Sequence, residues 1–147
     1  MPRDIPNRYV LGFLFTPGLD EVVLLRKRWG MPHIIGKLTA PGGHMAEGET
    51  PAEAMRREYV EETAVDLLDW RHEMDLHAGE SAEPRWTVHV FSASSSLAHL
   101  ARTNEEEPVA LFPVAELYRL DVVPNLRWIV PFALDRRLLR PQTLLER

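Results

Sequence analysis

The segment that constrains this chain most is residues 43–65, with the sequence GHMAEGETPAEAMRREYVEETAV. Thr50 and Glu53 have the spacing of a capping box, in which each side chain bonds the other residue's backbone N–H. Pro51 suits the first helical position, and the residues that follow are mostly good helix formers without glycine. The segment therefore predicts a helix over residues 51–63.

Three glutamates fall on one side of this predicted helix. Glu58, Glu61 and Glu62 are spaced i, i+3 and i+4, which places them within about 100° of arc. Arg57 is the only local cation aimed at them, and like charges this close disfavour folding unless a cation neutralises them. The spacing alone leaves two interpretations open, a solvated acidic helix face and a metal site.

The residues before the helix favour a metal site. Pro41, Gly42 and Gly43 can bend the backbone sharply and leave a carbonyl free to point at an ion. A carboxylate cluster together with a bare backbone oxygen is what a hard cation such as Mg²⁺ prefers. We therefore expect Mg²⁺, or Mn²⁺ in its place, as the cofactor.

The segment resembles the signature of the Nudix hydrolase family, G-x5-E-x7-R-E-U-x-E-E-x-G-U, where U is a bulky aliphatic residue. The matching residues are Gly43, Glu49, Arg57, Glu58, Glu61, Glu62 and Val65. Two positions depart from the signature. Tyr59 replaces an aliphatic residue, and Ala64 replaces the last glycine, so the turn leaving the helix lacks a freely left-handed residue.

Similarity extends over nearly the whole chain and is greatest to the branch that hydrolyses nucleoside triphosphates, including enzymes that remove oxidised purine nucleotides. The resemblance implies cleavage to a nucleoside monophosphate and pyrophosphate. ADP-ribose hydrolysis, dinucleoside polyphosphate hydrolysis and a non-catalytic nucleotide-binding domain of the same fold stay open as alternatives. The accessory motifs usual in the ADP-ribose, dinucleoside polyphosphate, coenzyme A and NADH branches are missing from the chain.

The resemblance also implies roles for single residues. Glu58 and Glu62 would be the principal metal ligands, Glu61 a ligand or proton acceptor, and Gly42 or Gly43 the source of a carbonyl ligand. Arg57 would hold Glu61 in place, and Glu49 would brace the junction between loop and helix without touching the metal.

An acidic loop before Val109 offers one further carboxylate for metal binding or base catalysis. Glu106 aligns best with the family, while Glu105 and Glu107 are each one residue away. A solvated loop is the alternative interpretation of this acidic run.

Three residues are candidates for contact with the substrate. Thr39 and Asn125 occupy positions where the oxidised-purine branch reads the base, and they retain one hydroxyl and one amide of that branch's larger set. Such a reduced set predicts modest base preference. Arg26, in the basic run 26–28, is either a solvated strand end or a residue that attracts phosphate.

Periodicity predicts one α+β domain over residues 1–147, compatible with the family's α/β/α sandwich around a mixed central sheet. The expected strands are residues 8–15, 21–26, 36–40, 70–76, 86–93 and 109–112. We expect a final helix over about residues 125–139, with Asn125 as its cap and Pro131 in or near its first turns. Residues 94–107 read as a polar, mobile loop.

Composition argues against duplex DNA and a membrane as partners, whereas a small nucleotide is the partner that the resemblance implies. A net charge of −5 argues against binding to duplex DNA. The sequence has no cysteine, no apolar run of the ~20 residues that span a bilayer and no signal-peptide core, so we expect a cytoplasmic location. A homodimer is left open. The six histidines show no metal-ligand spacing of the H-x3-H kind.

Overall fold

The computed structural model describes residues 3–80 and 83–138. In chain order the elements are β1 (Asp4–Phe15), β2 (Glu21–Arg26), β3 (Leu38–Thr39), β4 (Gly42–Ala46), α1 (Pro51–Thr63), β5 (Arg71–Glu80), β6 (Glu83–Ser94), the 3₁₀ turn η1 (Ser96–Leu100), β7 (Val109–Pro113), the 3₁₀ turn η2 (Val114–Glu116) and α2 (Leu126–Leu138). None of the helices in the described residues is long and apolar enough to cross a membrane.

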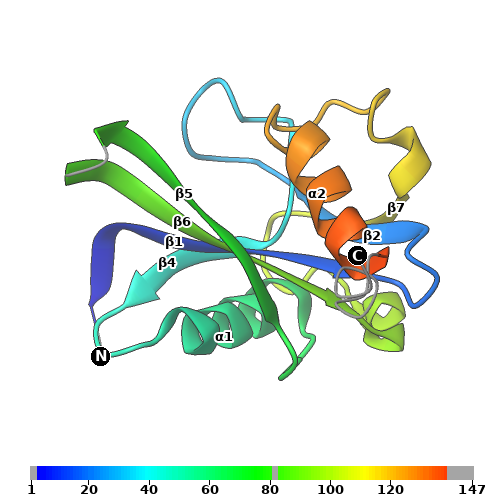
Figure 1. Ribbon diagram of the computed structural model, residues 1–147, viewed down its shortest axis with the longest axis horizontal. Helices are drawn as coiled ribbons and strands as arrows, with labels where there is room; N and C mark the ends of the chain where they lie inside the picture. The colour runs from blue at the N-terminus through cyan, green and yellow to red at the C-terminus, as the bar shows by residue number, and fades with distance from the viewer. Residues whose placement is uncertain (1–2, 81–82, 139–147) are drawn as a thin grey trace, which may run out of the picture.

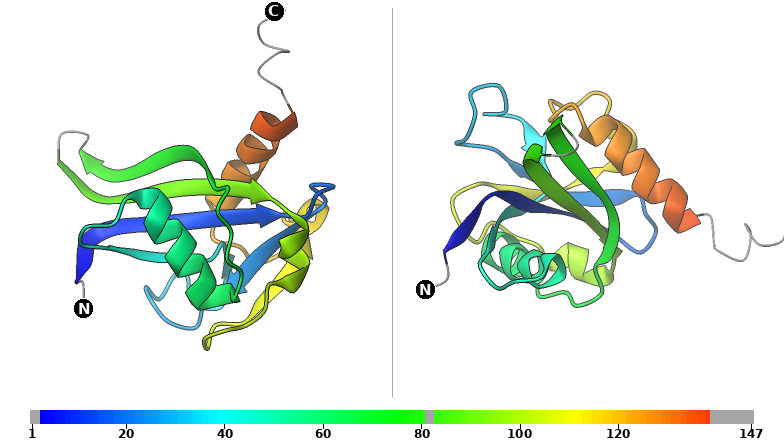
Figure 2. Two further views of the ribbon diagram at one scale, coloured as in Figure 1. Left: turned by 90° about the horizontal axis from the view of Figure 1, so that it is seen from below. Right: turned by 60° about the vertical axis from the view of Figure 1, so that its left-hand side comes forward.

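The strands form one mixed sheet of seven, in the order β3-β2-β1-β6-β5, with β4 paired to β1 and β7 to β2. β1 runs parallel to β6 along its length, while its other edge is shared between β4 and β2, both antiparallel. The helices α1 and α2 lie on opposite faces of this sheet (Figures 1 and 2). The predicted α/β/α sandwich with a mixed central sheet is confirmed.

Alternate residues of β1 supply two separate cores, because successive side chains of a strand point to opposite faces. Phe13 and Phe15 belong to the core beneath α2, and Val10 and Leu14 belong to the core beneath α1. The helix residues that complete these cores are Leu126, Ile129, Val130 and Ala133 of α2 and Ala54, Met55 and Tyr59 of α1. Both faces of the sheet are therefore covered, and α1 is fixed against β1 and β4.

The bend expected over Pro41, Gly42 and Gly43 is confined to Pro41, because Gly42 already opens strand β4 and pairs with Leu11 of β1. A side chain at Gly42 would collide with the backbone carbonyl of Val10. Neither Gly42 nor Gly43 is among the glycines with positive φ. Glycine is required here for the close approach of two backbones, a need that the sequence does not reveal until the partner strand is known.

The loop after η1 is attached to the end of α1, in contrast to the mobile loop that we expected. The backbone N–H of Arg102 donates to the carbonyl of Thr63, and that of Asn104 donates to Glu62. The Asn104 side-chain amide also donates to the carbonyls of Val60 and Glu61. These bonds satisfy carbonyls that a helix end leaves without partners.

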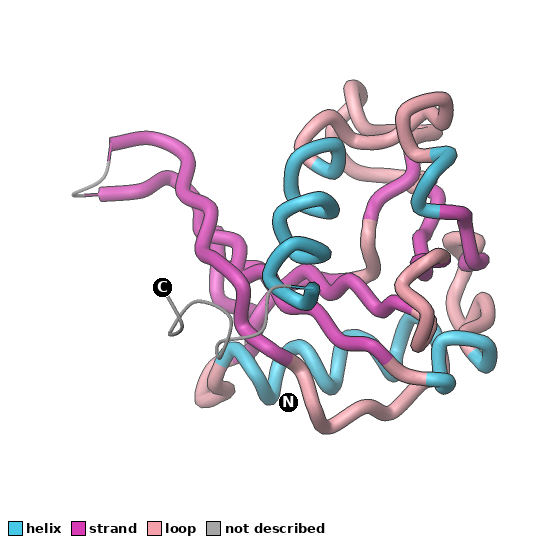
Figure 3. Tube along the Cα trace, turned by 45° about the vertical axis from the view of Figure 1, so that its right-hand side comes forward, coloured by secondary structure: helices cyan, strands magenta, loops and turns pink. Residues whose placement is uncertain are grey.

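The remaining differences are at element ends. The strand expected over residues 36–40 is only the two-residue β3. The expected final helix is present as α2 with Pro131 in its second turn, but Asn125 does not cap it through its side chain, whose Oδ1 has no hydrogen-bond partner among the described residues. The strands β5 and β6 are longer than predicted and form a hairpin that extends beyond the rest of the sheet (Figure 3).

Candidate active site

The carboxylates of Glu58 and Glu62 lie on a sheltered side of α1. A side chain at Gly43 of β4 would collide with the Glu58 carboxylate, so the missing Cβ makes room for it. The Oε2 atom of Glu62 is buried and has no hydrogen-bond partner among the described residues. An unpaired buried acceptor is unfavourable unless something else satisfies it, and a cation would.

Burial also makes this pair hard to ionise. It raises the pKa of Glu58 to about 7, although Arg57 acts in the opposite direction. It raises the pKa of Glu62 to about 8, and the negative charges of Glu58 and Glu107 add to the effect. Two neighbouring carboxylates whose pKa values are raised in this way would be easier to ionise if a further cation lay next to them.

Arg57 connects the parts of the site. Its Nε and Nη2 atoms donate to the two oxygens of Glu49 at 2.6 and 2.9 Å, and Nη2 also donates to the carbonyl of His44 at 3.0 Å. Its Nη1 atom donates to Glu58 at 3.0 Å and to Glu61 at 3.2 Å. The sequence predicted that Arg57 is aimed at the glutamates of α1, and the resemblance implied the contact with Glu61; the structure adds a direct bond to Glu58.

Glu49 connects the end of β4 with α1 through hydrogen bonds to both. Its Oε1 atom accepts a hydrogen bond from the backbone N–H of Ala46 at 2.7 Å, in addition to the bonds from Arg57. The Arg57 hydrogen bond holds the pKa of Glu49 below its usual value. Glu49 therefore ties the end of β4 to α1.

The donor set fits a hard divalent cation. Glu58 and Glu62 offer buried carboxylate oxygens next to the glycines of β4, and the orphaned Oε2 of Glu62 is a free ligand atom. The Glu61 side chain is 47% exposed and reaches the pair only through Arg57. The individual roles of these residues, and of the Gly42 and Gly43 carbonyls, stay predictions.

The acidic loop approaches the same carboxylates, and its three glutamates differ in environment. Glu107 is buried, accepts a bond from the backbone N–H of Arg28 at 2.9 Å and pairs with Lys27 at 3.1 Å. Glu105 is exposed, and its negative charge contributes to the raised pKa of both Glu58 and Glu62. Glu106 is exposed as well, and its predicted role stays untested.

The three predicted substrate residues gather around the short strand β3. Thr39 lies in β3, which pairs with the end of β2 at Leu25 and Arg26. On the other side of β3, the backbone N–H of Val123 donates to the carbonyl of Leu38, which brings the segment before α2 alongside. Asn125 lies two residues further along this segment, and its side-chain Oδ1 is buried without a hydrogen-bond partner among the described residues.

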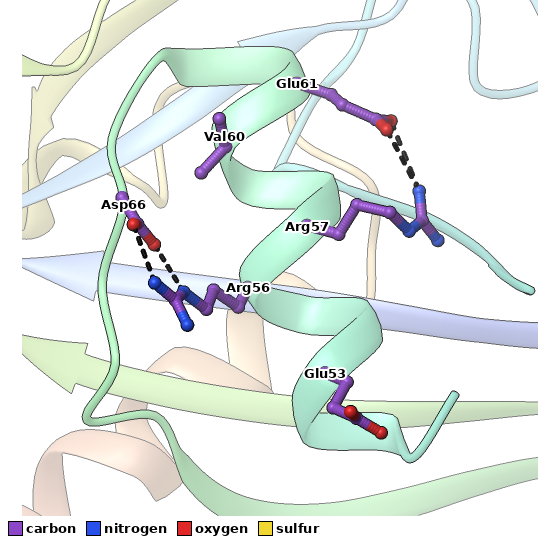
Figure 4. A pocket seen from close by; sticks show the side chains of 6 residues that line it. All are labelled: Glu53, Arg56, Arg57, Val60, Glu61 and Asp66. Carbon is purple, nitrogen blue, oxygen red and sulfur yellow. Dashed lines mark hydrogen bonds and ion pairs between the residues drawn. The ribbon is translucent and has the colours of Figure 1, made fainter. Parts of the chain in front are cut away.

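A different hollow, of about 520 Å³, lies on the outer face of α1 (Figure 4). It is lined by Glu53, Arg56, Arg57, Val60, Glu61 and Asp66. Arg56 and Asp66 form a bidentate ion pair across it, at 2.6 and 2.9 Å. Neither Glu58 nor Glu62 lines this hollow, so we do not regard it as the catalytic cleft.

Sequence reasoning missed Asn104 and the role of Lys27. Asn104 fastens the acidic loop to α1, and Lys27 pairs with Glu107 and opposes the raised pKa of Glu62. The basic run 26–28 marks Lys27 but not its pairing, because the partners of both residues are far away in the chain.

Comparison with known proteins identifies the family. The profile described as "NUDIX domain" matches residues 6–131. A Mycobacterium tuberculosis protein named "Putative 8-oxo-dGTP diphosphatase 2" is 29% identical over 117 residues, covering 76% of this chain and 79% of that protein.

Solved structures show the same fold. The Nudix domain of Shewanella oneidensis NrtR, in complex with ADP ribose, has a TM-score of 0.74 at 19% identity and covers 91% of this chain and 90% of that one. A MutT structure, from a study of the Aliivibrio salmonicida and Vibrio cholerae proteins, has a TM-score of 0.67 at 16% identity and covers 84% and 92%. The chain belongs to the Nudix family, whose enzymes generally use divalent metal ions, and it is a pyrophosphohydrolase acting on phosphoric anhydrides.

Proposed function

We propose that this Nudix hydrolase cleaves nucleoside and deoxynucleoside triphosphates to a monophosphate and pyrophosphate, with Mg²⁺ or Mn²⁺ as its cofactor. The observation that carries the proposal is the partly buried pair Glu58 and Glu62, in which Glu62 has an orphaned acceptor atom and only Glu58 is paired with Arg57. The name of the Mycobacterium tuberculosis relative supports a nucleoside triphosphate as the substrate class. The missing accessory motifs of other branches support the same class.

In this proposal Glu58 and Glu62 hold the metal, with Glu61 and the Gly42 or Gly43 carbonyl as further ligands. The bound ion supplies positive charge that neutralises phosphate oxygens and makes water a better nucleophile. Arg57 keeps Glu58 oriented through its 3.0 Å hydrogen bond, and Glu49 fixes Arg57 in turn.

A loop carboxylate would accept the proton from the attacking water. We assign this role to Glu105 in place of Glu106, a shift of one residue from the sequence alignment. The support is electrostatic, because the charge of Glu105 acts on both Glu58 and Glu62. Glu107 is occupied by Lys27 and the backbone of Arg28, which suits a positioning residue.

The base would be read near β3. Thr39 offers a hydroxyl, and the unpaired Oδ1 of Asn125 could accept a hydrogen bond from a base amino group. Arg26 would attract phosphate, although in the free protein its Nη1 donates to the carbonyl of Gly36 at 2.8 Å. With so few polar readers, discrimination between bases should stay within ~10- to 200-fold.

A screen of nucleotides with identified products tests the proposal. We expect triphosphates to yield monophosphate and pyrophosphate in the presence of Mg²⁺ and no turnover in EDTA. A strong preference for ADP-ribose, which occupies the Shewanella oneidensis neighbour, or for a dinucleoside polyphosphate would contradict the proposed substrate class. Tight nucleotide binding without hydrolysis would indicate a non-catalytic domain. A cytoplasmic location and a homodimer are further proposals, the latter checked by light scattering.

A further inference from the structure

The β5–β6 hairpin carries a second group of metal-ligand side chains, none of which belongs to α1 or the acidic loop. His72 Nε2 lies 2.6 Å from Asp75 Oδ1, and His89 Nδ1 lies 2.7 Å from the same oxygen. These ligand atoms all lie within 4.8 Å of one another. Two imidazole nitrogens with one carboxylate suit zinc and its neighbours, in contrast to the oxygen ligands that Mg²⁺ prefers.

A β-bulge creates this arrangement. In a regular strand His72 and Asp75, at i and i+3, would point to opposite faces of the sheet. Here His72 pairs with Phe91 and Asp75 pairs with His89, and the register shifts between them at Glu73. The extra residue places both ligands on the face that His89 and Phe91 share.

The bulged residue, Glu73, anchors the strand through its own side chain. The Glu73 side chain is fully buried and accepts a hydrogen bond from the Ser92 hydroxyl at 2.6 Å. It also pairs with Arg71 at 2.9 Å and with Arg136 of α2 at 2.8 Å. This network fixes the backbone on which His72 and Asp75 are carried, so the ligands are positioned by the fold.

The site is rigid on one side and open on the other. The His89 side chain is 9% exposed, whereas Asp75 is 36% and His72 50% exposed. The His72 ring also packs against Phe91, with centroids 5.2 Å apart. An ion can therefore enter from solvent, and water can complete its coordination.

Asp75 is held by both histidines. Its Oδ1 atom lies within hydrogen-bond distance of His72 Nε2 and of His89 Nδ1, so both rings already point at the carboxylate that would share the ion. Burial alone would raise the pKa of Asp75, but the hydrogen bonds from His89 and His72 outweigh burial and hold that pKa below its usual value.

Arg8 of β1 also contacts His89 and would therefore compete with a metal ion for it. Its Nη2 atom lies 2.8 Å from His89 Nε2, and a guanidinium can only donate, so Nε2 must be the acceptor. His89 is then neutral, with its proton on Nδ1 and directed at Asp75. An ion at Nδ1 requires the proton to move to Nε2, where it would face Arg8. Since Arg8 is exposed, its side chain can turn away at small cost.

We propose that His72 Nε2, Asp75 and His89 Nδ1 form a second metal site, for Zn²⁺ or a similar transition-metal ion, and that Arg8 opposes its occupation. A tetrahedral ion with ligands at ~2.0–2.1 Å would leave one position for water. The proposal is independent of the triphosphate reaction assigned to α1.

Calorimetric titration with Zn²⁺, in saturating Mg²⁺ to occupy the α1 centre, tests the site. We expect the wild-type protein to bind a single equivalent of Zn²⁺ that His72→Asn fails to bind. The matched control is His77→Asn on the same hairpin, where His77 bonds only the Thr87 hydroxyl at 2.9 Å among the described residues. Zn²⁺ should raise the melting temperature of wild type and His77→Asn and leave that of His72→Asn unchanged.

Arg8→Ala gives a signature that adventitious surface binding would lack. Removing the competing donor should tighten Zn²⁺ binding by about 10-fold, the size of effect that a partner of a ligating histidine usually has. Equal Zn²⁺ binding by wild type and His72→Asn, or no binding by wild type, would overturn the proposal. An unchanged or weaker affinity in Arg8→Ala would contradict coordination through His89 Nδ1.

Discussion

At the scale of single residues, Arg57 and the glycines of β4 determine how the carboxylates of α1 are presented. Arg57 donates hydrogen bonds to Glu49, which has a structural role, and to Glu58 and Glu61, which face the site. Its contacts raise its own pKa further above the usual value, so it stays charged. Gly43 supplies empty space next to Glu58 in place of a functional group. The site thus depends on a missing side chain as well as on charged ones.

Glu62→Gln tests the buried pair. The change keeps the shape and removes the charge, so we expect turnover to fall ~100-fold or more and Mg²⁺ affinity to drop, while the fold survives. Steady-state kinetics over a range of Mg²⁺ concentrations measures both effects. Glu47→Gln, at an exposed glutamate, is the control and should behave as wild type. A fully active Glu62→Gln would refute the assignment of this residue.

We expect the substitution of Ala64 by glycine to stabilise the folded protein. It ends α1 in a left-handed conformation, with φ 63° and ψ 16°, where the family signature has glycine. Because a left-handed conformation costs a non-glycine residue about 1–2 kcal/mol, Ala64→Gly should raise the free energy of unfolding by up to about 1 kcal/mol. Urea denaturation measures the change.

The control is Ala52→Gly, at an exposed position within α1, which should lower the free energy of unfolding by roughly 0.5–1 kcal/mol. If Ala64→Gly destabilises the protein as Ala52→Gly does, the left-handed end of α1 does not strain Ala64.

At the scale of elements, the acidic loop and α1 act as one unit. Asn104 bonds the carbonyls of Val60 and Glu61, and Glu107 pairs with Lys27 after β2. The loop therefore links the end of α1 to the start of the segment that follows β2. The backbone of the loop is therefore held close to Glu62, and Glu107 is fixed by its own partners.

Single substitutions of the loop glutamates separate their roles. Glu105→Gln should lower kcat by ~100-fold, as loss of a general base usually does. Glu106→Gln should stay near wild type if Glu105 is the base, because only the charge of Glu105 acts on both Glu58 and Glu62. Glu107→Gln should mainly lower the melting temperature, since it breaks the pair with Lys27. A loss of kcat confined to Glu106→Gln would show instead that Glu106 is the base, as the sequence alignment predicts.

Local signals predicted some elements well and left others out. The capping box and its spacing gave α1 its bounds, and the apolar run gave β2 its bounds, because both patterns lie within the element itself. β4 could not be predicted, since its glycines are explained only by the approach of β1. The group around His72 depends on a bulge, and sequence spacing assumes regular strands. The attachment of Asn104 joins residues 43 apart in the chain.

At the scale of the whole molecule, the buried carboxylates couple stability to pH and metal. Without metal, folded Glu58 and Glu62 keep their protons up to pH values of about 7 and about 8, whereas the unfolded chain loses them near 4.5. The folded state binds more protons in this window, so its stability is greatest below the window and falls as pH rises through it.

We therefore expect the metal-free protein to lose about 2 kcal/mol or more between pH 5 and pH 8, given ~1.4 kcal/mol for each pKa unit. Glu62→Gln should show a flatter profile. Mg²⁺ should raise the melting temperature more at pH 8 than at pH 5, because it replaces the missing protons. Thermal denaturation with Mg²⁺ or EDTA at both pH values measures this, and an equal effect of Mg²⁺ at both would contradict the coupling.

The parallel pairing of β1 with β6 has a consequence for synthesis on the ribosome. β1 is synthesised before its parallel partner, because the residues that pair with Arg8 through Phe15 are Thr87 through Ser94, about 80 residues later. At ~5–20 residues per second, one edge of the central strand waits roughly 4–16 s for its partner. During that interval β2 and β4 can cover the other edge, but the apolar residues of β1 cannot complete either core. The apolar residues of β1 therefore stay accessible in the nascent chain until β6 and α2 have been synthesised, and we expect this to be the interval in which the chain is most prone to aggregate.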